Sequence, residues 1–324
     1  MGEFDLIARY FTRPAREAVL GVGDDCALLA PRPGMQLAIS SDMLVQGRHF
    51  FADVDPAALG HKALAVNLSD LAACGARPLA FTLALALPQV DEPWLAGFSA
   101  GLLALADAHG CELVGGDTTQ GPLNICITVF GEVPAGQALL RSGARPGDDL
   151  YVSGTLGDAR LALEALLGHI QLPAGALQAA RQRLERPTPR VALGMALRGI
   201  ASSALDVSDG LTGDLGHILK ASGVGATLDT SITSQLIAAR ALFTGSGGQF
   251  SSNLLHQCTL AGGDDYELAF TAPTAQREAV QAAALQAGVP VTRIGTVDST
   301  PGLRVLDGAG QPLAAGYASF DHFG

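Results

Sequence analysis

Strand-like apolar runs alternate with helical stretches rich in alanine and leucine along the whole sequence. Two helices are predicted in the first half, at 56–74 and 92–109, because their apolar residues recur at spacings of three and four. The strand-like runs of this half are 36–45, 79–87, 112–114 and 123–133. Strands that alternate with helices of this length favour a mixed α/β or α+β protein.

A polar segment rich in glycine and proline, RSGARPGDD at 141–149, interrupts this alternation. Such segments are typical of domain boundaries. With 324 residues the chain is long enough for two domains of ordinary size. We therefore expect an N-terminal domain at 1–137 and a C-terminal domain at 138–324.

The second half repeats the alternation of strands and helices. A short apolar run leads into Asp206, and the Gly/Ser-rich stretch 245–252 is predicted to be a loop. Further strands are expected at 149–152, 226–228, 266–271, 289–297 and 303–306, and helices at 158–167, 177–186, 190–202, 211–222 and 274–287.

The charge pattern excludes several classes of function. Acidic residues outnumber basic ones by 31 to 20, and Lys62 and Lys220 are the only lysines. A protein that grips nucleic acid needs a basic stripe, which this sequence lacks. The most apolar stretch, 79–87, is too short to span a bilayer. Only 16% of residues are charged, which favours some surface hidden in an oligomer.

The expected compartment is the cytoplasm. The N-terminal residues MGEFDLIARY lack the basic segment and apolar run of a secretory signal. The five cysteines are an odd number without a CxxC pair, which argues against a disulfide framework and against zinc. We interpret them mainly as buried free thiols.

The most informative feature for function is a series of acidic segments placed where an apolar element meets small residues. One of these acidic segments, residues 115–117, is expected to end a strand. The residues concerned are Asp24 and Asp25; Ser40, Ser41 and Asp42; Asn67 and Asp70; Gly115, Gly116 and Asp117; Asp206, Ser208 and Asp209; and Asp264, Asp265 and Glu267.

Each of these segments alone is also an ordinary turn or helix-capping sequence, and Asp209 before Gly210 could simply cap a helix. As a set they indicate metal binding. Asp42 and Asp70 lie in apolar surroundings, where an unpaired carboxylate carries a large desolvation penalty, and few basic residues are nearby to neutralise it. Mg²⁺ takes carboxylate and hydroxyl oxygens and keeps substrate phosphates as its other ligands.

Several Mg²⁺ ions point to nucleotide phosphate chemistry, because phosphoryl transfer needs alignment and neutralisation of charge on the phosphate oxygens. The sequence has no G-x-x-x-x-G-K-[ST] loop, and neither lysine follows a glycine-rich turn. P-loop and protein-kinase designs are therefore excluded. A kinase of this kind would rely on metal ions in place of lysine.

The ordered segments GVGDDCALL, SSD, HKALAVNLSDLAACGARP, VGGDTT, RSGARPGD, DVSDGL, GGDDYEL and SFDHF cover nearly the whole chain. In this combination the chain resembles the thiamine-monophosphate kinases, a family of the aminoimidazole ribonucleotide synthetase superfamily. The resemblance implies an α/β domain at 1–137 that binds ATP and Mg²⁺ and pairs its sheet with a second copy in a homodimer. It also implies an α+β domain at 138–324 that completes the active-site cleft.

The activity implied by the resemblance is direct in-line transfer of the γ-phosphoryl group of ATP to thiamine monophosphate, the last step of thiamine diphosphate biosynthesis. The acceptor is already an anion near neutral pH, so we expect neither a strong general base nor a covalent phospho-enzyme. The implied partners are these two small molecules, without nucleic acid or membrane.

The resemblance also implies roles for individual residues. The implied catalytic residues are Asp42, Asp117, Asp209 and Arg141. The implied ATP contacts are Gly116, Asp117, Arg141 and Ser208, and the implied contacts to thiamine monophosphate are His49, Asp264 and Phe320. The implied magnesium ligands are Asp25, Ser40, Ser41, Asp42, Asp70, Asp117, Asp206 and Asp209.

Three residues depart from the family pattern. Ser41 stands where threonine is common, Asp264 where glutamate is common, and Phe320 where tyrosine or tryptophan is seen. Serine keeps the hydroxyl, and phenylalanine keeps an aromatic face that attracts the cationic thiazolium. The carboxylate of Asp264 is shorter than that of glutamate and reaches less far toward a substrate.

Two alternatives differ in kind from this interpretation. The first is another enzyme of the superfamily, such as aminoimidazole ribonucleotide synthetase, selenophosphate synthetase or the hydrogenase-maturation dehydratase. Selenophosphate synthetase uses an N-terminal Cys or selenocysteine, whereas the first cysteine here, Cys26, lies within GDDCA. The second is a non-catalytic protein that buffers Mg²⁺ or Ca²⁺ with acidic loops, against which the RSGARPGD segment argues.

Overall fold

The computed structural model describes residues 2–244, 250–313 and 317. Its contacts divide the chain into two compact units. Unit 1 comprises the residues up to Leu71 together with Ala76–Ala138. Unit 2 comprises Ala72–Gly75 and the residues from Leu139 onward.

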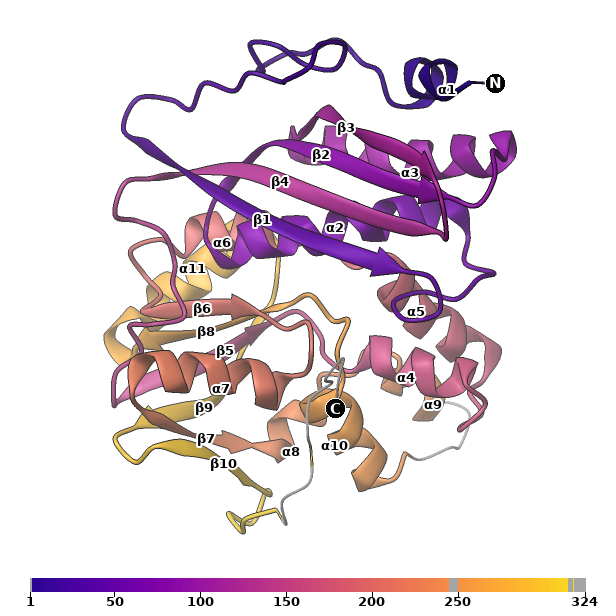
Figure 1. Cartoon of the computed structure of the whole chain (residues 1–324). Helices are drawn as coiled ribbons and strands as arrows, with labels where there is room; N and C mark the ends of the chain where they lie inside the picture. Colours follow the sequence, from indigo (N-terminus) through magenta and orange to yellow (C-terminus); the bar gives the residue numbers. More distant parts are fainter. Residues whose placement is uncertain (1, 245–249, 314–316, 318–324) are drawn as a thin grey trace. The chain divides into compact units, whose positions relative to one another are not determined.

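Unit 1 is a four-stranded sheet with helices on one face (Figure 1). The strand order is β1-β4-β2-β3, in which β4 is antiparallel to both neighbours and β2 is parallel to β3. The strands are β1 (Met35–Val45), β2 (Arg77–Leu87), β3 (Glu112–Gln120) and β4 (Asn124–Pro134), and the helices are α1 (Glu3–Tyr10), α2 (Pro56–Ala73) and α3 (Glu92–His109).

The bounds predicted for α3 are confirmed by its two caps. The side chain of Asp91 accepts a hydrogen bond from the N–H of Trp94 at the start, and Gly110 takes the left-handed conformation (φ 58°) at the end. Leu95, Phe98 and Leu102 of this helix are completely buried. Helices α2 and α3 thereby supply the apolar core beneath the sheet.

The other face of the sheet carries apolar side chains that nothing in the described chain covers. Leu37, Ile39 and Met43 of β1 alternate along the strand and keep 44%, 59% and 52% of their surface exposed. They stand on the face opposite to the helices, because Leu44, the residue after Met43, points to the other face and is buried. We call this surface the open face.

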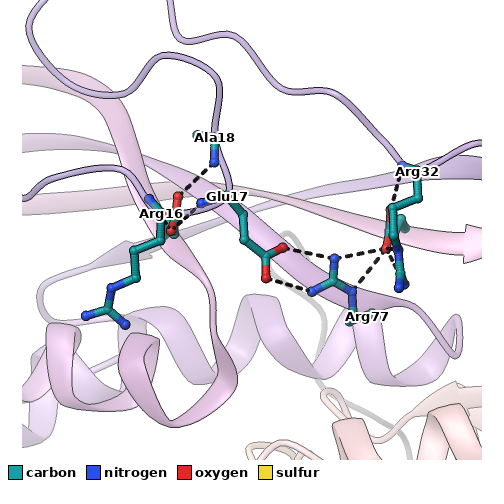
Figure 2. Close-up of polar contacts among 7 residues, drawn as sticks. Arg16, Glu17, Ala18, Arg32 and Arg77 are labelled. Carbon is teal, nitrogen blue, oxygen red and sulfur yellow. Dashed lines mark hydrogen bonds and ion pairs between the residues drawn. The ribbon is translucent and has the colours of Figure 1, made fainter.

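A loop that carries Asp24 and Asp25 precedes β1 and is fastened to the sheet at its beginning. The carboxylate of Glu112, the first residue of β3, accepts hydrogen bonds from the N–H groups of Arg16, Glu17 and Ala18 at 2.7, 2.9 and 3.1 Å. Figure 2 shows these three consecutive residues around one acceptor. A carboxylate that binds several N–H groups makes charge-assisted hydrogen bonds, which are stronger than neutral ones.

The end of the same loop is held by Glu132 of β4, whose side chain is 1% exposed. Arg32 donates to it from both its backbone N–H and its guanidinium, at 3.1 and 2.6 Å. Arg77 donates to it at 3.0 Å and also pairs with Glu17, so its guanidinium bridges the two ends of the loop (Figure 2). The loop that presents Asp24 and Asp25 is therefore anchored to the sheet on both sides.

Unit 2 is a six-stranded sheet of order β10-β7-β9-β5-β8-β6. Helix α7 packs on one face, and α11 lies on the other (Figure 1). The strands are β5 (Asp148–Ser153), β6 (Ser203–Asp206), β7 (Gly225–Asp229), β8 (Leu268–Pro273), β9 (Val291–Asp298) and β10 (Gly302–Leu306). The helices are α4 (Asp158–Leu166), α5 (Ala174–Glu185), α6 (Val191–Ala196), α7 (Leu211–Ser222), α8 (Thr230–Thr233), α9 (Arg240–Thr244), α10 (Ser252–Ala261) and α11 (Arg277–Ala287), with a 3₁₀ turn at Thr274–Gln276.

Several predicted elements need correction. The helix expected at 190–202 ends at Ala196, because Gly199 turns the backbone to φ 73°. The strand expected from 266 begins at Leu268, because Tyr266 has a positive φ of 51°. Helix α10, whose first turn is capped by Ser251, had not been predicted.

Within the described residues, no helix combines the length and the apolar character that a membrane span requires.

We predict that Glu132→Gln lowers the free energy of unfolding by about 2 kcal/mol at neutral pH, because the buried acceptor of two guanidinium groups loses its charge. Burial raises the pKa of Glu132, but the hydrogen bonds from Arg32 and Arg77 outweigh burial and set the pKa below its ordinary value. This contribution is therefore present above the unfolded-state pKa and is lost as the pH falls through the folded-state pKa.

Urea unfolding at pH 7 and pH 4 tests this prediction, and the difference between variant and parent should shrink at pH 4. The matched control is Glu92→Gln, which removes an ion pair whose side chains are half-exposed. It should change the free energy by less than about 0.5 kcal/mol. A difference at Glu132 that does not depend on pH would contradict the prediction.

Candidate active site

A first polar cluster lies where β1 packs on α2. Ser40 and Asp42 stand two residues apart on β1 and face the helix, where Asn67 and Asp70 stand three residues apart. The hydroxyl of Ser40 donates to Oδ2 of Asp70 at 2.5 Å. The backbone N–H of Asp42 donates to Oδ1 of Asn67 at 3.1 Å. The structure thus brings together three of the predicted magnesium ligands, and we call these four residues the edge cluster.

The side chain of Ser41 is not part of the edge cluster. As the residue between Ser40 and Asp42 it points to the open face, where its hydroxyl lies 3.1 Å from the carbonyl of Ile127 and 3.0 Å from Oγ1 of Thr128. Its hydroxyl is therefore occupied within the sheet.

A second group of carboxylates lines a cavity of about 600 Å³ in unit 1. Asp24 and Asp25 come from the anchored loop, and Gly116 and Asp117 come from β3. Helix α1 and the residue that follows it line the cavity with apolar side chains, namely Phe4, Ile7 and Phe11. The cavity therefore combines an acidic side with an apolar side, and we call it the loop cavity.

Strand β3 continues through this region, so the expectation that 115–117 end a strand is wrong. Pairing with β2 goes on to Gln120 past an irregularity at Val114. Gly116 permits this because it has φ 148°, and a Cβ built on it would lie 1.9 Å from the carbonyl oxygen of Leu83. The close contact places Asp117 on the strand rather than after it.

The sheet order sets the edge cluster and Asp117 apart. Asp42 is in register with Ile127, Leu83 and Gly116 across the four strands. Three strand spacings separate the two ends of this row, about 14 Å. Within one copy of unit 1, the two acidic groups thus lie at opposite edges of the sheet.

The two groups also lie on different faces. Asp117 is in register with Ala84, which pairs with Cys126, which in turn pairs with Met43. Met43 belongs to the open face, whereas Asp42 faces α2. Within 2–244, 250–313 and 317, no group of three or more His, Cys, Asp or Glu side chains is arranged to hold a metal ion.

His49, a predicted substrate contact, follows β1 in a tight turn. Its Nδ1 accepts a hydrogen bond from the N–H of Val45 at 2.9 Å, so the neutral ring carries its hydrogen on Nε2. The buried Lys62 donates to the carbonyl oxygen of His49 at 3.2 Å. The turn therefore presents an N–H donor next to the end of β1.

In unit 2 the segments around 206–209 and 264–266 run side by side. Asp206 ends the edge strand β6, and the carbonyl groups of the next two residues accept hydrogen bonds from the opposite segment. The N–H of Asp264 donates to Ser208 at 2.9 Å, and the N–H of Tyr266 donates to Val207 at 2.9 Å. The predicted residues Asp206, Ser208 and Asp264 are thus brought together.

The second of these segments has an unusual backbone. Asp264 and Tyr266 are the non-glycine residues with positive φ among those described, at 65° and 51°. At Gly263 a Cβ would lie 2.3 Å from the carbonyl oxygen of Ser208. Left-handed non-glycine residues cost free energy and persist where the surroundings hold them.

Two buried acids of the same segment fix its backbone through hydrogen bonds and ion pairs. Asp265 accepts the N–H of Gly157 with both oxygens, at 2.9 and 3.0 Å, and burial raises its pKa well above the ordinary value. Glu267 is fully buried and pairs with Arg183 and Arg190 at 2.7 and 2.5 Å. Of the acids in GGDDYEL, Asp264 is therefore the one that stays half-buried and accessible.

Sequence reasoning missed Asp214, in the first turn of α7. Its Oδ2 accepts hydrogen bonds from three consecutive N–H groups, those of Ser208, Asp209 and Gly210. Burial raises the pKa of Asp214 to about 6, against the lowering effect of these bonds. The available signal was an aspartate in the first turn of a helix that begins after a glycine.

Two predicted residues remain, of which the structure describes one. The side chain of Arg141 is exposed, while its carbonyl oxygen accepts a hydrogen bond from Ser222 of α7 at 3.3 Å. Phe320, the expected aromatic contact to the thiazolium, lies outside the described residues.

Two family models match the chain. The model described as AIR synthase related protein, N-terminal domain, matches residues 23–133, and the model described as AIR synthase related protein, C-terminal domain, matches residues 145–308. Among curated proteins, thiamine-monophosphate kinase of Salmonella typhimurium is 48% identical over 99% of this chain and 98% of its own length.

Solved structures agree with this result. The crystal structure of thiamine-monophosphate kinase from Stenotrophomonas maltophilia K279a has a TM-score of 0.82 and 45% identity, covering 93% of this chain and 94% of that one. AaThiL complexed with AMPPCP and TMP has a TM-score of 0.77 and 29% identity, covering 91% of this chain and 89% of that one.

We predict that Gly116→Ala destabilises unit 1 by about 2 kcal/mol, because its Cβ would collide with the backbone of Leu83. The adjacent Gly115→Ala is the matched control, since a Cβ there meets only the Thr82 methyl group at 3.8 Å. Thermal and urea unfolding of both variants measure the difference. Equal stabilities for the two variants would contradict the close approach of β3 to β2.

Proposed function

The chain belongs to the thiamine-monophosphate kinase family of AIR synthase related proteins, and we propose that it transfers the γ-phosphoryl group of ATP to thiamine monophosphate. The observation that carries this proposal is the 48% identity to a thiamine-monophosphate kinase over essentially the full length of both chains. A structure 29% identical to this chain holds AMPPCP, a non-hydrolysable ATP analogue, together with TMP.

The carboxylates of the chain suit Mg²⁺. This ion is usually held by one or two carboxylates together with waters and substrate phosphates, so it does not need a group of three acids. Asp42 and Asp70 of the edge cluster, Asp25 and Asp117 at the loop cavity, and Asp206 and Asp209 of unit 2 each offer such a pair of hard oxygen donors. When bound, Mg²⁺ would neutralise charge on the phosphate oxygens.

The other residues would bind and orient the two substrates. The exposed guanidinium of Arg141 would donate charge-assisted hydrogen bonds to phosphate, and His49 would donate from Nε2. Asp264 and Phe320 are proposed to contact the thiamine part. For Phe320 the proposal rests on the sequence alone.

The proposed reaction is a single displacement. A terminal phosphate oxygen of thiamine monophosphate forms a bond to the γ-phosphorus as the bond from that phosphorus to the bridging oxygen of ATP breaks, and ADP leaves. Thiamine diphosphate is the other product. The attacking oxygen is already anionic, so the chain need supply no general base.

We also propose that two copies of the chain pair through their open faces. Leu37, Ile39 and Met43 are exposed on that face, and a second sheet would bury them. The edge cluster and Asp117 lie at opposite edges of one sheet, about 14 Å apart. A two-fold pairing of sheets would place the β3 edge of one copy near the β1 edge of the other, so that both acidic groups serve one triphosphate.

The proposed activity is tested with the purified chain, ATP, Mg²⁺ and thiamine monophosphate. Thiamine diphosphate should form at one equivalent per ADP, and chelation of the metal with EDTA should stop the reaction. Unphosphorylated thiamine should give no product, because it offers a neutral hydroxyl in place of a phosphate oxygen. A folded sample that turns over thiamine, or neither compound, would reject the assignment.

The shared site predicts complementation between inactive variants. Asp42→Ala and Asp117→Ala should each abolish turnover, and Asp42→Ala should melt at a similar or higher temperature because repulsion from Asp70 is relieved. When the two variants are co-expressed and pair at random, half of the dimers are mixed, and each mixed dimer has one intact site out of two. The mixture should therefore recover about one quarter of the parent activity.

The matched control pairs Asp42→Ala with Asp70→Ala. Both changes fall in the edge cluster, so every site of such a mixed dimer is defective and no activity should return. Absence of recovery in the first mixture would show that each copy holds a complete site, and recovery in the control would show that Asp42 and Asp70 do not serve the same site.

A further inference from the structure

Asp214 makes an unusual set of contacts for a residue outside the predicted site. Its side chain is buried, with 5% of the residue exposed. A single oxygen, Oδ2, accepts the N–H groups of Ser208, Asp209 and Gly210, each at 3.1 Å. Three consecutive amides around one oxygen fix the backbone of that stretch, because each bond defines the direction of one peptide plane.

The other side of the same stretch is fixed by the 264–267 segment. The N–H of Val207 donates to the carbonyl of Glu267 at 2.8 Å, and the carbonyl groups of Val207 and Ser208 accept from Tyr266 and Asp264. The loop 207–210 is therefore held between a strand-like segment and one carboxylate. Asp214 is the part of this support that comes from a side chain.

Ordinary helix capping does not account for the position of this acceptor. The residue before α7 is Gly210, which has no side chain and makes no side-chain cap. Asp214 lies four residues further on and reaches back past the helix start to residues 208 and 209. The contacts thus extend beyond the helix to the two residues expected to meet the nucleotide and its metal.

This arrangement carries a cost in desolvation. Burial disfavours the charged form of Asp214, and the negative charge of Asp209 adds to that effect. A serine cap at 210 cannot take the place of Asp214, because Gly210 has φ 124° and a Cβ there would lie 2.9 Å from the backbone carbon of Ala261. The carboxylate holds Ser208 and Asp209 in one conformation despite this cost.

We propose that Asp214 is a positioning residue, which fixes the backbone of Ser208 and Asp209 so that their side chains bind the magnesium complex of the nucleotide. The inference rests on the proposed function, because the nucleotide contacts of Ser208 and Asp209 belong to it. Asp214 itself touches neither substrate nor metal in this scheme.

The test compares Asp214→Ala with Asp214→Asn. The amide oxygen of asparagine can take the place of Oδ2 and accept the same N–H groups, whereas alanine offers no acceptor. Titration calorimetry with AMPPCP and Mg²⁺, without a thiamine compound, gives the Kd. We expect Asp214→Ala to raise the Kd and the KM for ATP at least tenfold, and Asp214→Asn to stay within about threefold of the parent.

Asp229→Ala is the matched control. Asp229 also accepts a backbone N–H at the start of a helix of unit 2, that of Ser231 at 2.8 Å, but it supports no predicted site residue. Its removal should leave the Kd unchanged. An equal rise of the Kd in Asp229→Ala would assign the effect to general stability and overturn the proposal.

Three outcomes decide the role of Asp214. A Kd for Asp214→Ala equal to that of the parent overturns it, and so does an equal loss in the alanine and asparagine variants. If Asp214→Ala does not fold, Asp214→Glu replaces it, because glutamate keeps the charge but moves the acceptor by one methylene group. A raised Kd in that folded variant then supports the proposal, and an unchanged Kd overturns it.

The failure of the proposed function gives a different result. Binding of AMPPCP is measured without any phosphate acceptor, so absence of thiamine diphosphate in the assay rejects the kinase assignment alone. The ratio of the Kd values for Asp214→Ala and Asp214→Asn decides the positioning role independently.

Discussion

The structure depends on how it divides its carboxylates between two tasks. Buried acids such as Glu132, Asp214 and Glu267 accept backbone N–H groups or guanidinium groups, which offset part or all of their desolvation. Half-buried or exposed acids such as Asp25 and Asp209 lie on the loops that the first group holds in place. An acidic chain can thus keep several carboxylates accessible, because other carboxylates fix the loops and turns on which they stand.

The sheet of unit 1 imposes the second constraint. Its order puts β1 and β3 at the two edges, so that residues in perfect register across the sheet remain three strands apart. Lengthening side chains cannot remove this separation, which follows from the spacing of hydrogen-bonded strands. A triphosphate that needs both acidic groups must therefore receive them from a larger assembly, and the exposed apolar residues of the open face offer a surface on which one can form.

The sequence predicted elements well where periodicity and caps agree, as in α3, whose bounds lie between Asp91 and Gly110. It failed where tertiary contacts override local signals. Gly116 is typical of a turn, yet parallel pairing with β2 carries β3 past it. Among the site residues that the resemblance implies, Ser40, Asp42 and Asp70 lie together, whereas the hydroxyl of Ser41 points to the other face. For Asp214 the sequence offers only an aspartate in the first turn of a helix, because its contacts to 208–210 appear only in the folded chain.

The lysines explain why such a chain would depend on metal ions. Lys62 is 3% exposed and donates to the carbonyl oxygen of His49, so its charge is committed within unit 1. Lys220 lies in the last turn of α7, nine residues after Leu211 and hence about 14 Å along the helix from the 208–210 loop. Lys220 therefore lies too far along the helix to act as a P-loop lysine at that loop. If a triphosphate binds near Ser208 and Asp209 as proposed, its charge would have to be balanced by arginine or by divalent ions, and the carboxylate at 209 favours the ions.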